Sequence, residues 1–180
     1  LKWLGIIGMI FLAYIFKSGT VESPVWFERS WWGILGLIGW GYLAGGSVYL
    51  IIKERILLGI LAVLFFLVLN IISSSGLIPM LTPVQGWFNV LIGGNVPIVS
   101  GMLAALIVRR VSRDWKKLAI YLCIYGLVCL ILGLILHQWF IVSKILATPS
   151  WGMLCNGVSI LIFVLIYYWI DVRGYTKFSR

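Results

Sequence analysis

A cluster of basic residues is the most chemically distinctive feature of this sequence. Five cations fall within nine positions, and they are Arg109, Arg110, Arg113, Lys116 and Lys117. Guanidinium and ammonium groups bind phosphate, so Arg109, Arg110, Lys116 and Lys117 are candidates for holding an anionic cofactor. No glycine-rich phosphate loop accompanies them. Because apolar runs flank the cluster, a cytoplasmic loop between two membrane spans is the alternative interpretation.

The only histidine, His137, ends an apolar run and is a candidate for acid–base catalysis, because imidazole titrates near neutrality. No serine, cysteine or carboxylate lies beside it, so a helix end cap or a solvated group is the alternative. Cys123 and Cys129 are six residues apart in one apolar run, and Cys155 lies in another. Without a C-x-x-C motif or a histidine cluster, we expect no metal site and apolar packing for the thiols.

The segment from Ser73 to Asn95 is the most irregular part of the chain. It is rich in serine, glycine and proline, contains no charged residue, and carries many apolar side chains. Non-helical backbone at membrane depth survives only where protein or a wet cavity satisfies it. This segment, including Asn95, is therefore a candidate wall or lid of a substrate site. An interfacial helix without a ligand is the alternative, and Asn95 is also suited to capping the helix that follows.

The composition indicates a membrane protein. The 180 residues are 62% hydrophobic and only 11% charged, whereas soluble domains carry about 25% charged residues. The formal net charge of +9 does not indicate nucleic-acid binding, because the cations lie at the ends of apolar runs and not on one polar face. We expect them to mark topology and to contact anionic lipid headgroups.

The apolar runs predict an all-α fold, a polytopic bundle of six transmembrane helices in a single domain over residues 1–180. The predicted spans are Leu1–Phe16, Ser30–Ile52, Ile56–Ile72, Val96–Val108, Leu118–Leu136 and Gly152–Ile170. The fourth is short for a hydrocarbon core of about 30 Å, so residues 87–91 complete it or form a re-entrant segment. Within the second span, Gly41 and Gly45 have the small-residue spacing that lets helices pack closely. The first span is also short, and we expect the sequence to be part of a longer protein.

The basic residues predict the orientation of these spans. Alternation of the connectors places eleven cations inside and three outside, the three being Lys17, Arg29 and Lys144. Both termini are then cytoplasmic, by the excess of Lys and Arg on that side. Most of the ten tryptophans also fall near predicted span ends, as an interfacial aromatic belt requires. We expect a multi-pass protein of the bacterial cytoplasmic membrane.

Two motifs near the end of the chain resemble a known family. Residues 143–151 read SKILATPSW, and residues 168–174 read YWIDVRG after one apolar span. They resemble the NKxLWTPS and YWxIDVxG motifs of the heparan-α-glucosaminide N-acetyltransferase-like membrane family, including its bacterial DUF5009 members. Residues 29–40 are also similar to those bacterial members. The residues that match the motifs are Lys144, Thr148, Pro149, Ser150, Asp171 and Gly174.

The resemblance implies a membrane acyltransferase, of which this chain is a middle portion. Such proteins move an acetyl group from cytosolic acetyl-CoA to a sugar on the other side of the membrane. The predicted substrate-binding residues are Lys144 and Ser150, which match the motif, together with the neighbouring Trp151 and Asn95 of the irregular segment. His137 does not match the family's catalytic histidine, whose region is not part of this sequence. The family's Asp-Pro-Glu-Gly loop is missing from residues 73–95.

Two other function classes stay open. A transporter of small molecules or lipids would use a broken fourth span as a binding site at the membrane midplane. Apart from Lys2 at the start of the first span, the predicted spans contain no Asp, Glu, Lys or Arg, which argues against ion-coupled transport. A non-catalytic membrane subunit is the third class. The expected partners are membrane lipids and a sugar substrate but no nucleic acid, and association of several copies is left open.

Overall fold

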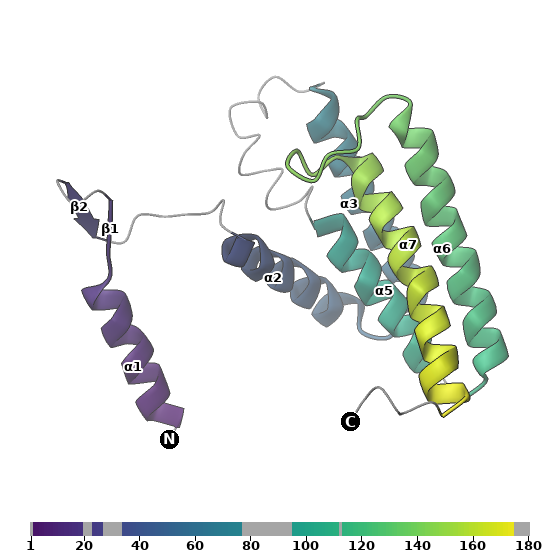
Figure 1. Cartoon of the computed structure of the whole chain (residues 1–180), viewed down its shortest axis with the longest axis horizontal. Helices are drawn as coiled ribbons and strands as arrows, with labels where there is room; N and C mark the ends of the chain where they lie inside the picture. Colours follow the sequence, from purple (N-terminus) through teal and green to yellow (C-terminus); the bar gives the residue numbers. More distant parts are fainter. Residues whose placement is uncertain (1, 20–22, 27–33, 77–94, 112, 175–180) are drawn as a thin grey trace. The chain divides into compact units, whose positions relative to one another are not determined.

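A computed structural model describes residues 2–19, 23–26, 34–76, 95–111 and 113–174 (Figure 1). The predictions for residues 30–33, for residues 77–94 and for the tail after Gly174 therefore lie outside the described residues. The chain separates into two compact units, residues 1–36 and residues 37–180, and each is described by itself. The expectation of a single domain stays a prediction.

The first unit contains a helix and a short hairpin. The helix α1 spans Lys2–Ile15, and the strands β1 (Lys17–Gly19) and β2 (Pro24–Trp26) pair antiparallel with Lys17 opposite Trp26. The indole Nε1 of Trp26 donates a hydrogen bond to the carbonyl oxygen of Tyr14 at 3.0 Å, which satisfies a carbonyl at the end of α1. The connector expected after α1 contains this small hairpin, and the other described elements are helices, as the predicted all-α fold class requires.

The second unit is a helical bundle. Its helices are α2 (Ile34–Ile52, which begins in the first unit), α3 (Ile56–Ser75), α5 (Val96–Val111), α6 (Trp115–His137) and α7 (Pro149–Tyr167). A π-helical turn, η3 (Tyr168–Val172), continues α7. The largest interface is between α6 and α7, while α5 contacts α3, α6 and α7 (Figure 1).

Three helices are long and apolar enough to cross a membrane. They are Ile56–Ser75, Trp115–His137 and the continuous segment Pro149–Val172. The apolar parts of α1 and α2, Trp3–Ile15 and Ile38–Ile52, are shorter. The helix α5 has 16 residues, about 24 Å at 1.5 Å per residue, as expected for the short fourth span. The bundle is therefore that of a membrane protein, and the six-span topology stays a prediction.

Local signals explain where these helices begin and end. α3 continues three residues beyond the predicted Ile72 and stops at Gly76, whose φ of 66° is left-handed. α6 begins at Trp115 because the Asp114 side chain caps it, and α7 begins at Pro149, whose fixed φ suits the first turn. Four predicted spans thus coincide with described helices but are too short, and they are Ile56–Ile72, Val96–Val108, Leu118–Leu136 and Gly152–Ile170. The first two predicted spans are longer than the helices α1 and α2 that the structure describes there.

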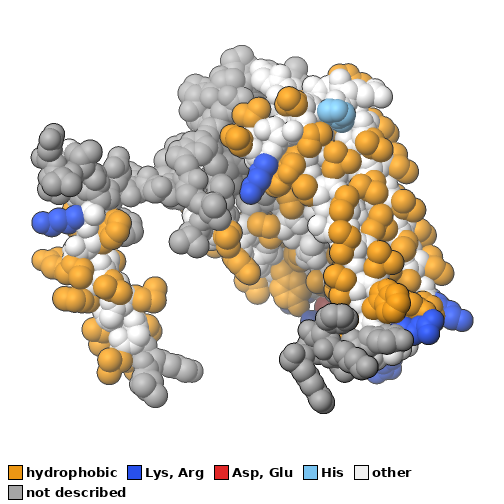
Figure 2. Space-filling model, in the orientation of Figure 1, with side chains coloured by type: hydrophobic (Ala, Val, Ile, Leu, Met, Phe, Trp, Pro, Cys, Tyr) orange, Lys and Arg blue, Asp and Glu red, His pale blue; other side chains and the backbone are white. Residues whose placement is uncertain are grey.

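The exposed surface of the bundle is apolar. Side chains such as Phe65, Ile124 and Leu165 are more than half exposed, and hydrophobic atoms cover most of the bundle face seen in Figure 2. A smaller set of apolar side chains is buried between the helices. Its larger cluster contains Leu67, Val96, Leu118, Leu122, Cys129, Met153 and Ile160, and a second cluster contains Val63, Val99 and Leu103. Lipid is the solvent that accommodates such an outer surface.

Glycines allow α6 and α7 to pack closely. A methyl group added at Gly157 of α7 would lie 2.8 Å from the carbonyl oxygen of Gly126 on α6, and one at Gly133 would lie 2.9 Å from the amide nitrogen of Leu154. Backbone atoms cannot yield as side-chain ends do. The two helices can approach this closely only because these positions lack a side chain.

The substitution Gly157→Ala tests this packing. We expect it to lower the stability of the purified protein in detergent by about 1–3 kcal/mol, because the added methyl group overlaps the backbone of α6. The measurement is thermal unfolding followed by circular dichroism. Gly101→Ala in α5 is the matched control, because no atom lies within 4 Å of the added methyl group. An unchanged or raised melting temperature for Gly157→Ala would contradict the close packing.

Candidate functional site

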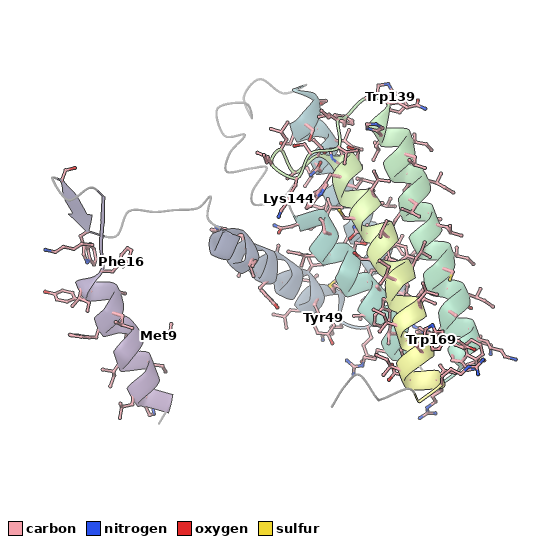
Figure 3. The ribbon with its side chains drawn as sticks, viewed as in Figure 1. Met9, Phe16, Tyr49, Trp139, Lys144 and Trp169 are labelled. Carbon is pink, nitrogen blue, oxygen red and sulfur yellow. The ribbon has the colours of Figure 1, made fainter. Side chains whose placement is uncertain are left out.

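Basic residues gather at one end of the bundle, called the basic end here. The turn between α2 and α3 and the joint between α5 and α6 meet there, because Nη2 of Arg109 lies 2.8 Å from Oε1 of Glu54. The contact of Trp115 with Tyr168, whose ring centroids are 5.5 Å apart, adds the end of α7. The described cations at this end are Lys53, Arg55, Arg109, Arg110, Arg113, Lys116, Lys117 and Arg173. The described part of the second unit has one other Lys or Arg, Lys144, at the opposite end (Figure 3).

The four predicted phosphate ligands differ in their surroundings. Arg109 pairs with Glu54 and also donates from Nη1 to the Tyr49 hydroxyl at 3.1 Å. Lys117 pairs with Asp114 at 3.4 Å. Arg110 and Lys116 are exposed, and neither side chain has a carboxylate partner among the described residues. An anion arriving from water would therefore meet Arg110 and Lys116 without displacing a carboxylate.

The Asp114 side chain occupies the amino-terminal end of α6. Its Oδ1 accepts hydrogen bonds from the backbone nitrogens of Lys116 at 3.2 Å and Lys117 at 3.3 Å. The hydrogen bond from the Lys117 backbone is the main reason that the pKa of this carboxyl is below its usual value, and the Lys117 ammonium lowers it further. Because these amides already have an acceptor, a phosphate at this end would be held by side chains.

The opposite end of the bundle buries uncharged polar groups. The Ser150 side chain is fully buried, and its Oγ lies 2.9 Å from the carbonyl oxygen of Phe140 and 3.1 Å from that of Ile141. Thr148 is also buried, accepts a hydrogen bond from the Ser143 backbone at 3.1 Å, and lies 3.3 Å from Ser150. The matched Thr-Pro-Ser sequence thus fastens the preceding loop onto the start of α7.

Asn70 ties α3 to the same loop. Its side chain is 1% exposed, and Nδ2 donates to the carbonyl oxygen of Ala147 at 3.0 Å. The two residues are 77 positions apart in the sequence. Ala147 has a φ of 47°, a left-handed conformation that costs a non-glycine residue energy. The bond to Asn70 helps to hold the loop in that shape.

The residues predicted to contact substrate all lie at this opposite end. Lys144 is exposed, Trp151 is half-buried, and Asn95 is buried at the start of α5, near Gly41 of α2. His137 is the exposed last residue of α6, and no described side chain forms a hydrogen bond with it. Figure 3 shows Lys144 at this end and Trp169 at the other. The 24 residues from Pro149 to Val172 separate the two ends by about 36 Å.

The sequence interpretation missed a polar group in the middle of the bundle. The Ser100 and Tyr125 hydroxyls are 2.6 Å apart, and the Tyr125 hydroxyl also lies 3.4 Å from the carbonyl oxygen of Ser100. Elsewhere in the bundle, two buried atoms, Oγ of Ser73 near the end of α3 and Nδ2 of Asn156 on α7, have no hydrogen-bond partner among the described residues. The sequence did not predict that the Ser100 and Tyr125 hydroxyls meet, because each is a single polar residue in an apolar run. Only the packing of separate helices brings them together.

In comparisons with family models, curated proteins and solved structures, no match to this chain was found. Within the described residues, no group of three or more His, Cys, Asp or Glu side chains is placed to hold a metal ion. The assignment of the chain to a family stays a prediction based on its two motifs.

The substitution Asn70→Leu tests the loop attachment. We expect it to destabilise the protein by about 1–3 kcal/mol, because the Ala147 carbonyl loses its buried donor. Thermal unfolding in detergent measures the effect. Gln138→Leu is the control, because it removes an exposed amide from the end of α6 and should change stability by less than about 0.5 kcal/mol. Equal effects of the two substitutions would show that the Asn70 bond does not stabilise the loop.

The Asp114 cap predicts a pH dependence of stability. The pKa of Asp114 is lowered in the folded protein. The ionised cap therefore stabilises the fold at pH values above the unfolded pKa, which is about 3.8. This stabilisation is lost as the pH falls through the lower pKa of the folded protein. We expect Asp114→Ala to lower the melting temperature at pH 7 and to match the original protein at pH 2. Asp114→Asn, which retains a capping oxygen, should lose less. A gap between the original protein and Asp114→Ala that persists unchanged at pH 2 would rule out the ionised cap.

Proposed function

We propose that this chain is part of a multi-pass membrane acyltransferase that uses cytosolic acetyl-CoA and acts on a sugar across the membrane. The proposal rests on the resemblance of residues 143–151 and 168–174 to one acyltransferase family. We also propose that the protein lies in a bacterial cytoplasmic membrane. Its basic end then faces the cytoplasm, because cytoplasmic loops carry the excess of Lys and Arg.

One structural observation carries the proposal. The two matching motifs form the two ends of a single membrane-length segment, Pro149–Val172. Buried uncharged hydroxyls and amides surround its beginning, and cations surround its end. Uncharged polar groups suit a hydroxyl-rich acceptor, and cations suit the phosphates of a donor. A protein that transfers a group between the two sides of a membrane needs these chemistries at opposite ends.

The basic end has cations that suit the phosphates of coenzyme A. Arg110 and Lys116 are exposed and have no carboxylate partner in the described segments. Arg109 and Lys117 are paired with Glu54 and Asp114, so an incoming phosphate would compete with these carboxylates for them. Bound acetyl-CoA would supply the activated acyl group as a thioester. The residues of this chain would bind its phosphates at the cytoplasmic face and hold the surrounding helices in place.

A transporter is the second candidate, and the buried polar group in the middle of the bundle favours it. Ser100, Tyr125 and the unpartnered amide of Asn156 belong to three helices that pack against one another. A polar solute crossing the bundle would need such groups at membrane depth. They belong to α5, α6 and α7, so in this case the binding residues would lie within the spans, away from the basic end.

Titration calorimetry with acetyl-CoA and CoA on the purified protein tests the proposal. We expect the double variant Arg110→Gln, Lys116→Gln to bind about tenfold more weakly or worse, because each lost cation removes a charge-assisted contact with phosphate. Lys144→Gln is the control, because it removes an exposed cation from the opposite end. Equal affinities of the double variant and the original protein would remove Arg110 and Lys116 from the CoA site. No CoA binding by the original protein would refute the acyltransferase and favour the transporter.

A further inference from the structure

Tyr168 holds Arg173 in one orientation. Nε of Arg173 donates to the Tyr168 hydroxyl at 2.8 Å, and its guanidinium carbon lies 5.4 Å from the centroid of the ring. This bond uses one of the five N–H donors of the guanidinium. The Nη donors have no partner among the described residues. A planar guanidinium with both Nη atoms available can donate hydrogen bonds to two oxygens of one phosphate.

The π-helical turn explains how Arg173 reaches Tyr168. In a regular α-helix, residues five apart lie about 140° apart around the axis. The wider turn from Tyr168 to Val172 brings Arg173 onto the same face, and the backbone nitrogen of Arg173 donates to the Tyr168 carbonyl at 3.0 Å. Gly174, with a left-handed φ of 69°, follows at once. Such π turns often occur at functional positions.

Two tryptophans lie beside Tyr168, and two exposed cations are close to Trp115 in the sequence. The rings of Trp115 and Trp169 lie 5.5 Å and 6.4 Å from that of Tyr168, and both are partly exposed. Arg113 and Lys116 flank Trp115 in the sequence, are exposed, and have no carboxylate partner in the described part of the chain. The exposed Asp171 is two residues before Arg173 but forms no ion pair with a described residue.

The adjoining surface of α6 and α7 is apolar and exposed. Ile120 and Tyr121 on α6 are 57% and 52% exposed, and Leu165 and Ile166 on α7 are 61% and 49% exposed. These side chains require lipid acyl chains beside them. Figure 2 shows Lys and Arg side chains at the end of the bundle next to this hydrophobic surface. An anion bound where the apolar surface ends is therefore at the height of lipid phosphates.

We propose that Arg173, oriented by Tyr168 and flanked by Trp115 and Trp169, binds the phosphate of an anionic phospholipid headgroup. Arg113 and Lys116 add attraction for its negative charge. The tryptophans take the interfacial position that amphipathic rings prefer. This site goes beyond the proposed acyl transfer, because its principal ligand is Arg173 and its occupant stays in the membrane.

Native mass spectrometry of the purified protein in detergent, titrated with phosphatidylglycerol or phosphatidylcholine, tests this proposal. We expect tighter binding of phosphatidylglycerol, and a loss of about tenfold in Arg173→Gln. Arg173→Lys keeps the charge but loses the planar fork, so its binding should also be weaker than that of the original protein. Lys144→Gln at the opposite end and Arg110→Gln in the proposed CoA site should keep their affinity for phosphatidylglycerol, which separates this test from that of the acyltransferase.

Three outcomes would overturn the lipid site. The first is equal affinity of the original protein for the two lipids. The second is unchanged binding in Arg173→Lys, which would indicate diffuse charge attraction in place of a shaped site. The third is displacement of phosphatidylglycerol by an equal concentration of glycerol 3-phosphate, which would assign the site to soluble phosphates. Melting curves of each variant confirm that it is folded before binding is compared.

Discussion

The close approach of α6 and α7 is the constraint on which the rest of the bundle depends. Gly126 and Gly133 on α6 face α7, and Gly157 on α7 faces α6. In lipid, burial of apolar surface adds little to helix association, so packing of this kind carries much of the stability. Because both helices are long, fixing them against each other fixes both ends: Trp115 against Tyr168 at the basic end, and the loop before Ser150 at the other.

The two ends solve different physical problems. At the basic end, cations stay exposed, because transferring a charge into lipid is costly and water or headgroups are within reach. At the opposite end, hydroxyls and amides are buried, and their hydrogen bonds give loop carbonyls and a loop amide partners that lipid could not provide. The loop from Gln138 to Thr148 can therefore take an irregular path, with Ala147 left-handed, without leaving those backbone groups unpaired.

The sequence was sufficient to place most of the described helices and insufficient to show how they meet. Apolar runs indicated α3, α6 and α7 well, because uninterrupted hydrophobic stretches are strong signals. The predicted spans were shorter than these helices, because Gly76, Asp114 and Pro149 set the helix ends by local interactions that hydrophobicity does not report. The hairpin after α1 was missed because three-residue strands carry almost no pattern. The sequence highlighted Gly41 and Gly45, which do pack against Ile98, but gave no weight to Gly157. Which glycine faces a neighbouring helix depends on tertiary packing.

The candidate site shows the same limit. The sequence grouped Arg109, Arg110, Lys116 and Lys117 as equivalent cations, but two of them have carboxylate partners, one supplied by Glu54 from a distant turn. Arg173 was counted only as a topology signal, although Tyr168 orients it. A phosphate is bound well by cations that are positioned and lack a partner, because paired ones must first give up a carboxylate. On the two proposals, the basic end has two kinds of site, with Arg110 and Lys116 facing soluble anions and Arg173 at the edge of the apolar surface. A soluble donor and a lipid headgroup can occupy the same face of the protein with different principal ligands.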